Sequence, residues 1–163
     1  MSAALSELVE RFNGVFIQEY NTRLVGGFDE PLYQPSVNGS IAEIRFTRDY
    51  FRSALHEVAH WCLAGESRRQ LVDYGYWYRP DGRGEKEQEE FFRFEVKPQS
   101  LELAFSKKFA VDFQVSCDNL NGAAGNSLKN AHAEIEFERQ VIEQLAVFQK
   151  QGFPERAQRI LDL

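Results

Sequence analysis

The stretch His-Glu-Val-Ala-His at residues 56–60 constrains this chain more than any other. Residues four apart on a helix project from the same face, so the imidazoles of His56 and His60 can share one cation. Glu57 lies beside them, whereas Trp61 points to the far side, which a helix can bury. The spacing therefore predicts a helix whose histidine face binds a metal ion. A purely structural histidine pair is the competing interpretation.

Length and composition favour a single globular domain over residues 1–163, long enough to bury a core without disulfides. Cys62 and Cys117 are expected to be reduced thiols, because neither has a CxxC partner. A net charge of −6 argues against direct nucleic-acid binding, which needs a basic surface. We expect no membrane span and no targeting segment, and hence a cytoplasmic location.

Hydrophobic periodicity predicts an α+β fold, with a small mixed sheet, packed helices and a zincin-like HExxH helix. Helices are expected near residues 4–20 and 128–151, with a short one after Pro154. A strand over 41–46 should lead into the histidine helix, which is expected to start within 47–50 and to end at Gly65. The other expectations are a loop over 21–40, an extended segment over 73–83, a helix over 85–94 limited by Pro98, and a strand over 109–116.

An active metal site needs a third ligand. Glu95 is the preferred candidate, since its neighbours Phe94 and Val96 are apolar and a buried carboxylate needs a cationic partner. Glu66 and the acidic residues within 85–90 are the alternatives. We expect His132 to be an exposed helical residue.

Two histidines and one carboxylate suit non-haem Fe²⁺, and they equally suit a Zn²⁺ hydrolase with an open water position. In a hydrolase, Glu57 would act as general base on a metal-bound water. In oxygen chemistry it would support a ligand or a proton path. The residues alone leave both options open.

Several blocks of the sequence, in order, resemble the bacterial elongation factor P hydroxylase family. These blocks cover residues 21–24, 29–31, 56–65, 68–69, 73–78, 80–83, 95–99 and 115–120. The resemblance implies hydroxylation of the lysine of translation elongation factor P that already carries a β-lysyl group. It also implies a zincin-like α+β fold and a metal triad, which carries over to His56 and His60, with Glu95 as the expected carboxylate.

The same resemblance suggests how the partner protein and its modified lysine bind. Carboxylates and aromatic rings could hold the amine-bearing side chain, and the candidates are Asp73, Tyr74, Tyr76, Trp77, Tyr78, Asp81 and Asp118. Three arginines, Arg68, Arg69 and Arg83, are candidates for contact with the acidic partner. Because no 2-oxoglutarate motif is evident, the electron source is open. A zinc hydrolase acting on peptide or RNA, and a non-catalytic module braced by metal, are the alternative functions.

Overall fold

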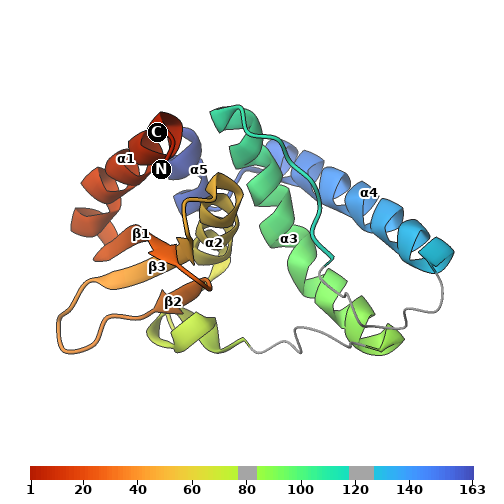
Figure 1. Cartoon of the computed structure of the whole chain (residues 1–163), viewed down its shortest axis with the longest axis horizontal. Coiled ribbons are helices and arrows are strands. Elements are labelled where there is room, and N and C mark those ends of the chain that lie inside the picture. The colour runs from red at the N-terminus through yellow and green to blue at the C-terminus, as the bar shows by residue number, and fades with distance from the viewer. Residues whose placement is uncertain (77–83, 118–126) are drawn as a thin grey trace.

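The computed structural model describes residues 1–76, 84–117 and 127–163, except the side chains of 127–130. It is an α+β protein with a small mixed sheet, as predicted, and Figure 1 shows α1 and α2 beside the sheet with α3 and α4 on the other side of α2. The elements are α1 Ala3–Tyr20, β1 Thr22–Phe28, β2 Leu32–Gln34, β3 Ala42–Thr47, α2 Phe51–Leu63, η1 Arg68–Gln70, η2 Val72–Gly75, α3 Glu85–Phe109, α4 Ser127–Gln151 and α5 Glu155–Leu161. Both η elements are 3₁₀ helices.

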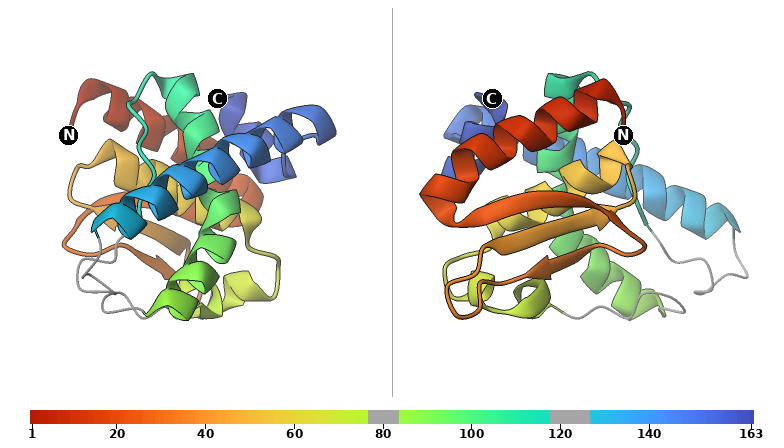
Figure 2. Two further views of the ribbon diagram at one scale, coloured as in Figure 1. Left: turned by 90° about the vertical axis from the view of Figure 1, so that its right-hand side faces the viewer. Right: turned by 60° about the vertical axis from the view of Figure 1, so that its left-hand side comes forward.

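The three strands pair in the order β1-β3-β2, with β1 parallel and β2 antiparallel to β3. Along β3 every second side chain is buried, namely Ala42, Ile44 and Phe46. This alternation turns one face of the sheet toward α1 and α2, as the right-hand view of Figure 2 shows. The strand predicted at 41–46 is therefore confirmed.

The loop predicted over residues 21–40 was wrong, since β1 and β2 both lie within it. Glycine usually indicates a break in a strand, but Gly26 has a packing role in β1. A Cβ at Gly26 would lie 2.8 Å from the carbonyl oxygen of Arg48 and closer still to the Phe46 ring. Glycine therefore lets β1 pass close to β3, a close approach that the composition of the segment does not reveal.

The histidine helix is confirmed as α2 with its N-cap within the predicted residues 47–50, whereas its C-terminal end differs from the prediction. Tyr50 is the N-cap and makes no capping hydrogen bond through its side chain. The helix ends at Leu63 with Ala64 as C-cap, so Gly65 does not cap it. Instead, buried Arg156 of α5 donates hydrogen bonds to the carbonyl oxygens of Cys62 and Ala64. The guanidinium of Arg156 thus provides the hydrogen bonds to carbonyl groups at the end of α2 that a glycine C-cap turn would otherwise provide.

Helix α3 continues to Phe109, so the prediction that Pro98 limits it was wrong. A proline inside a helix removes one backbone hydrogen bond and costs about 3 kcal/mol. Beyond it, however, Leu101 and Phe105 are fully buried in the main core cluster. Burial of two such side chains offsets a cost of that size, at about 1.5–3 kcal/mol each.

Two other local predictions were also wrong. Residues 111–117 form no strand, and their backbone instead lies beside α3, where Gln99 bonds to Ser116. The described part of the predicted extended segment folds into η2, where Asp73 and Tyr74 adopt positive φ angles of 47° and 61°. Residues 77–83 lie outside the described part of the chain.

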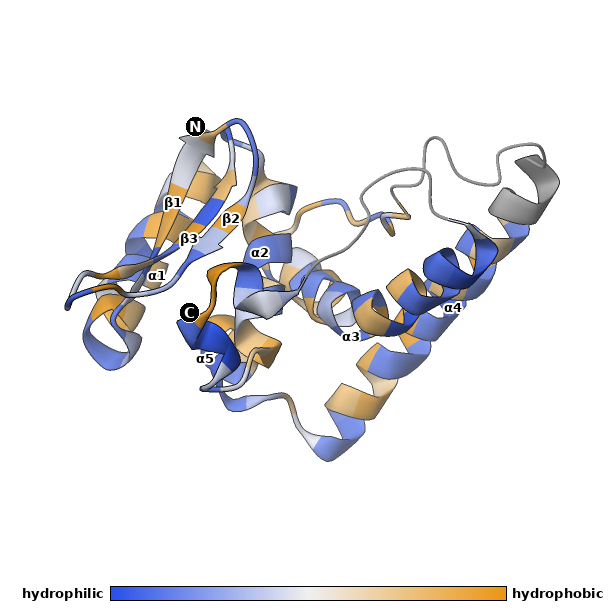
Figure 3. Cartoon of the chain, turned by 90° about the horizontal axis from the view of Figure 1, so that it is seen from below, coloured by the Kyte–Doolittle hydropathy of each residue, from blue (hydrophilic) through white to orange (hydrophobic). Residues whose placement is uncertain are grey.

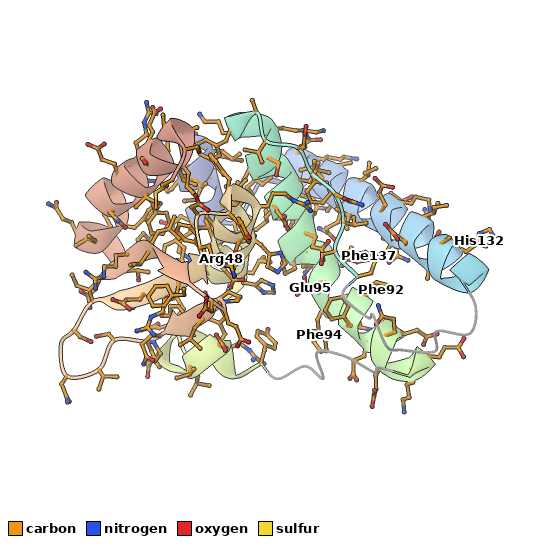
Figure 4. All side chains as sticks on the ribbon, viewed as in Figure 1. Arg48, Phe92, Phe94, Glu95, His132 and Phe137 are labelled. Atoms are coloured by element: carbon orange, nitrogen blue, oxygen red, sulfur yellow. The ribbon has the colours of Figure 1, made fainter. Side chains whose placement is uncertain are left out.

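Helix α4 lies alongside α3, and the predicted helices over 128–151 and after Pro154 are confirmed. Phe137 of α4 stacks on Phe92 of α3 with ring centroids 4.5 Å apart (Figure 4). Coloured by hydropathy in Figure 3, α4 carries both apolar and charged residues, as an amphipathic helix does. Among the described residues, the helices are all too short or too polar to span a bilayer.

Candidate metal centre

The side chains of His56 and His60 on α2 meet Glu95 of α3. Nε2 of His60 lies 3.0 Å from Oε1 of Glu95 and 3.1 Å from Nε2 of His56. Nε2 of His56 lies 3.7 Å from Oε2 of Glu95. Figure 4 shows Glu95 on α3, and its side chain is only 3% exposed. The structure thus brings together the three residues proposed as metal ligands.

The two shorter distances match those around a divalent cation, and the third, 3.7 Å, is slightly longer. Ligand atoms about 2.1 Å from one ion lie about 3.0–3.5 Å from each other in tetrahedral or octahedral geometry. Two imidazole nitrogens and a carboxylate are also a donor set that both Zn²⁺ and Fe²⁺ accept. The group therefore suits a divalent metal ion, whose identity the donor set does not fix.

The electrostatics around the three side chains favour positive charge. Burial by itself would raise the pKa of Glu95, but the imidazoles of His60 and His56 outweigh it and lower this pKa to about 2. For His56, burial alone would lower the pKa, because it disfavours the charged imidazolium. The hydrogen bond to Glu102 and the charge of Glu95 outweigh burial and raise the pKa of His56 to about 10. Surroundings that hold a proton on an imidazole also attract a metal cation.

Glu102 was missed by sequence reasoning. Its Oε2 accepts a hydrogen bond from Nδ1 of His56 at 2.8 Å, and Glu102 is only 4% exposed. A proton held on Nδ1 leaves the lone pair of neutral His56 on Nε2, which faces His60 and Glu95. Glu102 therefore selects the tautomer that can bind a metal.

Gln99, also missed, holds the carboxylate of the proposed ligand Glu95. Its Nε2 donates to Oε2 of Glu95 at 3.1 Å and to the carbonyl oxygen of Ser116 at 2.8 Å. Its Oε1 accepts from the backbone N–H of Ser116 at 2.9 Å. The sequence did contain a signal: Glu95, Gln99 and Glu102 are spaced as one face of a helix. Because the helix was expected to stop near Pro98, these three residues were not recognised as one helix face.

An open cleft of about 660 Å³ adjoins the metal centre on the side of the β3–α2 connection. His56 lines it, together with the neighbouring Glu57 and Glu102. The remaining lining residues are Pro31, Thr47, Asp49, Tyr50, Phe51, Arg52, Ser53 and Ser116. This volume is in the usual range for a small-molecule or side-chain site, roughly 300–1,000 Å³.

Glu57, predicted as the catalytic carboxylate, is half-buried and faces this cleft. Burial raises its pKa, the charges of His56 and His60 lower it, and Glu95 adds to the rise. Its side chain makes no hydrogen bond to any residue that the structure describes. The carboxylate is thus available to a substrate or to water in the cleft.

The predicted substrate residues before position 77 lie in and around η1 and η2. Asp73 accepts a hydrogen bond from the backbone N–H of Tyr33 at 2.8 Å. Tyr74 is buried and stacks on Tyr33, with ring centroids 4.3 Å apart. Both side chains therefore hold η2 against β2, and their predicted role in substrate binding stays a prediction.

The arginines of this segment are placed differently from one another. The guanidinium of Arg68 lies 4.1 Å from the centroid of the Tyr76 ring and donates to the carbonyl oxygen of Tyr74. Arg69 donates to the carbonyl oxygen of Ala64 at 3.4 Å. Their contact with a partner stays a prediction. The predicted residues Trp77, Tyr78, Asp81, Arg83 and Asp118 lie outside the described residues.

The other candidates lie apart from the three ligands. Glu66 is exposed, and so are the acidic side chains within 85–90. His132 is exposed near the start of α4, as expected, and Figure 4 shows it at the far end of that helix from Glu95. Both cysteines are free thiols, as predicted, and burial raises the pKa of Cys62 well above its usual value. Of the carboxylates weighed as third ligand, Glu95 is the one that meets the histidines.

Fold and site together define a class: α+β proteins in which two histidines of one helix and a carboxylate of another can hold a divalent cation. The model of a family described as elongation factor P hydroxylase matches residues 11–163. A curated protein of Haemophilus influenzae, named elongation factor P lysine hydroxylase, is 43% identical over 162 residues, covering 98% of this chain and 86% of its own length. The chain belongs to the elongation factor P hydroxylase family, which confirms the resemblance seen in its sequence blocks.

Proposed function

We propose that this protein hydroxylates a lysine of elongation factor P, and that the lysine carries a β-lysyl group when it reacts. Membership of the hydroxylase family supports the reaction. The observation that carries the site assignment is the meeting of His56, His60 and Glu95, whose facing nitrogen and oxygen atoms lie 3.0–3.7 Å apart. Among the described residues, this is the group able to hold the metal that such chemistry requires.

Dioxygen is the oxidant in such a hydroxylation, and an Fe²⁺ ion held by these three side chains would activate it for reaction with an aliphatic carbon. The chain itself contributes orientation and electrostatics. Glu102 keeps the proton of His56 on Nδ1, and Gln99 holds one oxygen of Glu95. Both supporting residues lie on the rigid helix α3, so the ligands meet without the mobility of loop residues.

Glu57 acts beside the metal rather than on it. Its carboxylate lines the cleft next to His56 and has no hydrogen bond to the described residues. In the hydrolase alternative this group would be a general base. In the proposed hydroxylase it interacts with the substrate or with a proton path, as expected for a carboxylate that adjoins the ligands.

The test is a reaction of the purified, Fe²⁺-loaded protein with β-lysylated elongation factor P in air, with a chemical reductant such as ascorbate as two-electron donor, followed by mass spectrometry. We expect a gain of one oxygen on the modified lysine, and none with His56→Ala. Cleavage of a peptide or RNA by a zinc-loaded protein, without oxygen gain, would instead establish the hydrolase. If His60→Ala unfolds the protein, metal serves the fold, whereas a folded but inactive variant supports a catalytic site.

A further inference from the structure

The cleft beside His56 is lined by several charged side chains, and one of its carboxylates lacks a hydrogen-bond partner among the described residues. Three carboxylates line the cleft, belonging to Asp49, Glu57 and Glu102, and the basic side chains among the lining residues are Arg52 and His56. Arg52 donates to the carbonyl oxygen of Gln114 at 2.7 Å, so its charge is directed toward that carbonyl. Glu57 is the lining carboxylate that neither the Met1 ammonium nor His56 pairs with, so it is the negative charge available to an entering group.

Two of these carboxylates already have partners. Asp49 lies 3.4 Å from the N-terminal ammonium of Met1, and Glu102 holds His56. Glu57 makes no hydrogen bond to the residues that the structure describes, and it is half-buried. A desolvated carboxylate without a partner is costly, and a cationic ligand would relieve that cost.

The walls of the cleft suit the rest of an aliphatic chain. Pro31, Tyr50 and Phe51 supply apolar surface near the mouth, and Tyr50 is 51% exposed. Methylene groups can pack along such surface while a terminal ammonium reaches a carboxylate further in. Of the three proposed ligands, His56 lines this cleft, so a chain lying in it passes directly beside the metal centre.

The described part of the aromatic segment offers less to an ammonium group. Tyr74 is buried against Tyr33, and Asp73 is bonded to the backbone of that residue. The face of Tyr76 is in contact with the guanidinium of Arg68, a cation that repels another cation. Asp73 and Tyr74 are thus already engaged with Tyr33, whereas Glu57 has no hydrogen bond to the residues that the structure describes.

From these observations we infer that a cationic aliphatic side chain enters the site through the cleft between the β3–α2 connection and α3, and that Glu57 binds its terminal ammonium. The inference rests on the proposed function, since it takes the β-lysylated lysine of elongation factor P as the occupant. It assigns Glu57 to recognition of the β-lysyl group, and it assigns entry to a surface different from the aromatic segment.

Binding and reaction are measured in separate experiments. A failure of the inferred ammonium site can then be distinguished from a failure of the proposed hydroxylase activity. The zinc-loaded protein, which cannot carry out oxygen chemistry, is titrated with fluorescently labelled elongation factor P in its unmodified and β-lysylated forms. The variants are Tyr50→Lys in the cleft and Tyr76→Lys in the aromatic segment, a matched pair of exposed tyrosines. Glu57→Gln and Glu90→Gln, an exposed position on α3, form the second pair. Circular dichroism and bound zinc verify each fold and site.

We expect Tyr50→Lys to weaken binding of the lysylated factor about tenfold, since it places a positive charge at the mouth, and Tyr76→Lys to change it less than twofold. Glu57→Gln should remove the preference for the lysylated over the unmodified factor, while Glu90→Gln keeps it. Equal effects of the two tyrosine variants, or an unchanged preference in Glu57→Gln, would overturn the inference. Wild-type protein that binds the lysylated factor yet adds no oxygen would refute the proposed function alone.

Discussion

Replacement of Glu102 by glutamine tests whether the metal centre depends on a carboxylate that touches a ligand rather than the metal. Glutamine keeps the size of the side chain and can still accept a hydrogen bond from His56, but it carries no charge. Because Glu102 is 4% exposed and 2.8 Å from Nδ1 of His56, water cannot easily replace the lost charge on that side.

The expected loss of metal affinity can be estimated in two independent ways, from hydrogen-bond energies and from the effect of losing a ligand's partner. A hydrogen bond to a charged group contributes about 1.5–3 kcal/mol, and loss of such a partner typically lowers metal affinity about 10- to 100-fold. The side chain of His56 is 26% exposed, so solvent moderates the effect. We expect Glu102→Gln to weaken metal binding about tenfold, or about 1.4 kcal/mol. Glu102→Ala also removes the acceptor, and it should approach a hundredfold.

The assay is competition for Zn²⁺ or Co²⁺ against a chromophoric chelator at one fixed pH. Glu90→Gln, the same exchange at an exposed position of α3, serves as the control and should bind metal like the wild type. Thermal unfolding of each metal-free variant shows whether the fold persists. If folded Glu102→Gln keeps its metal affinity within twofold, the charge of Glu102 does not hold His56 in its metal-binding tautomer.

Three further predictions concern stability, each measured as the free energy of unfolding in urea. Arg156→Met removes the buried donor at the end of α2 and its stacking on Trp61 at 4.7 Å, and should cost about 2–3 kcal/mol; a cost below about 0.5 kcal/mol would contradict this role. Phe137→Ala should cost about 3–5 kcal/mol, since the ring is 1% exposed and joins α4 to α3; an unchanged value would show that the stacking is dispensable. The pKa of Glu43 is lowered, mainly by the hydrogen bond from Arg23. The ionised Glu43 carboxylate therefore stabilises the fold fully above about pH 4.5, and this stabilisation is lost as the pH falls through the lowered pKa. Glu43→Gln should therefore be less stable than wild type by about 1 kcal/mol or less at pH 7. This difference should shrink as the pH falls below about 4.5, and a difference that grows in acid would refute the assignment.

Local regularities of the sequence determined much of the site. The four-residue spacing of His56 and His60 fixes their common face once a helix forms, because the helical repeat needs only neighbouring residues. The apolar neighbours of Glu95 likewise indicated a buried carboxylate, and the structure places it beside both histidines. The alternation along β3 and the amphipathic patterns of α1 and α4 were equally local signals.

Only the tertiary structure decided which residues support those side chains and which cleft adjoins them. Glu102 and Gln99 matter because α3 continues past Pro98, and it does so because Leu101 and Phe105 gain burial in a core formed by distant segments. The strands within 21–40 and the course of residues 111–117 depend on partners far away in the sequence. Such pairings are decided by the free energy of contacts between separate segments, which no local pattern encodes.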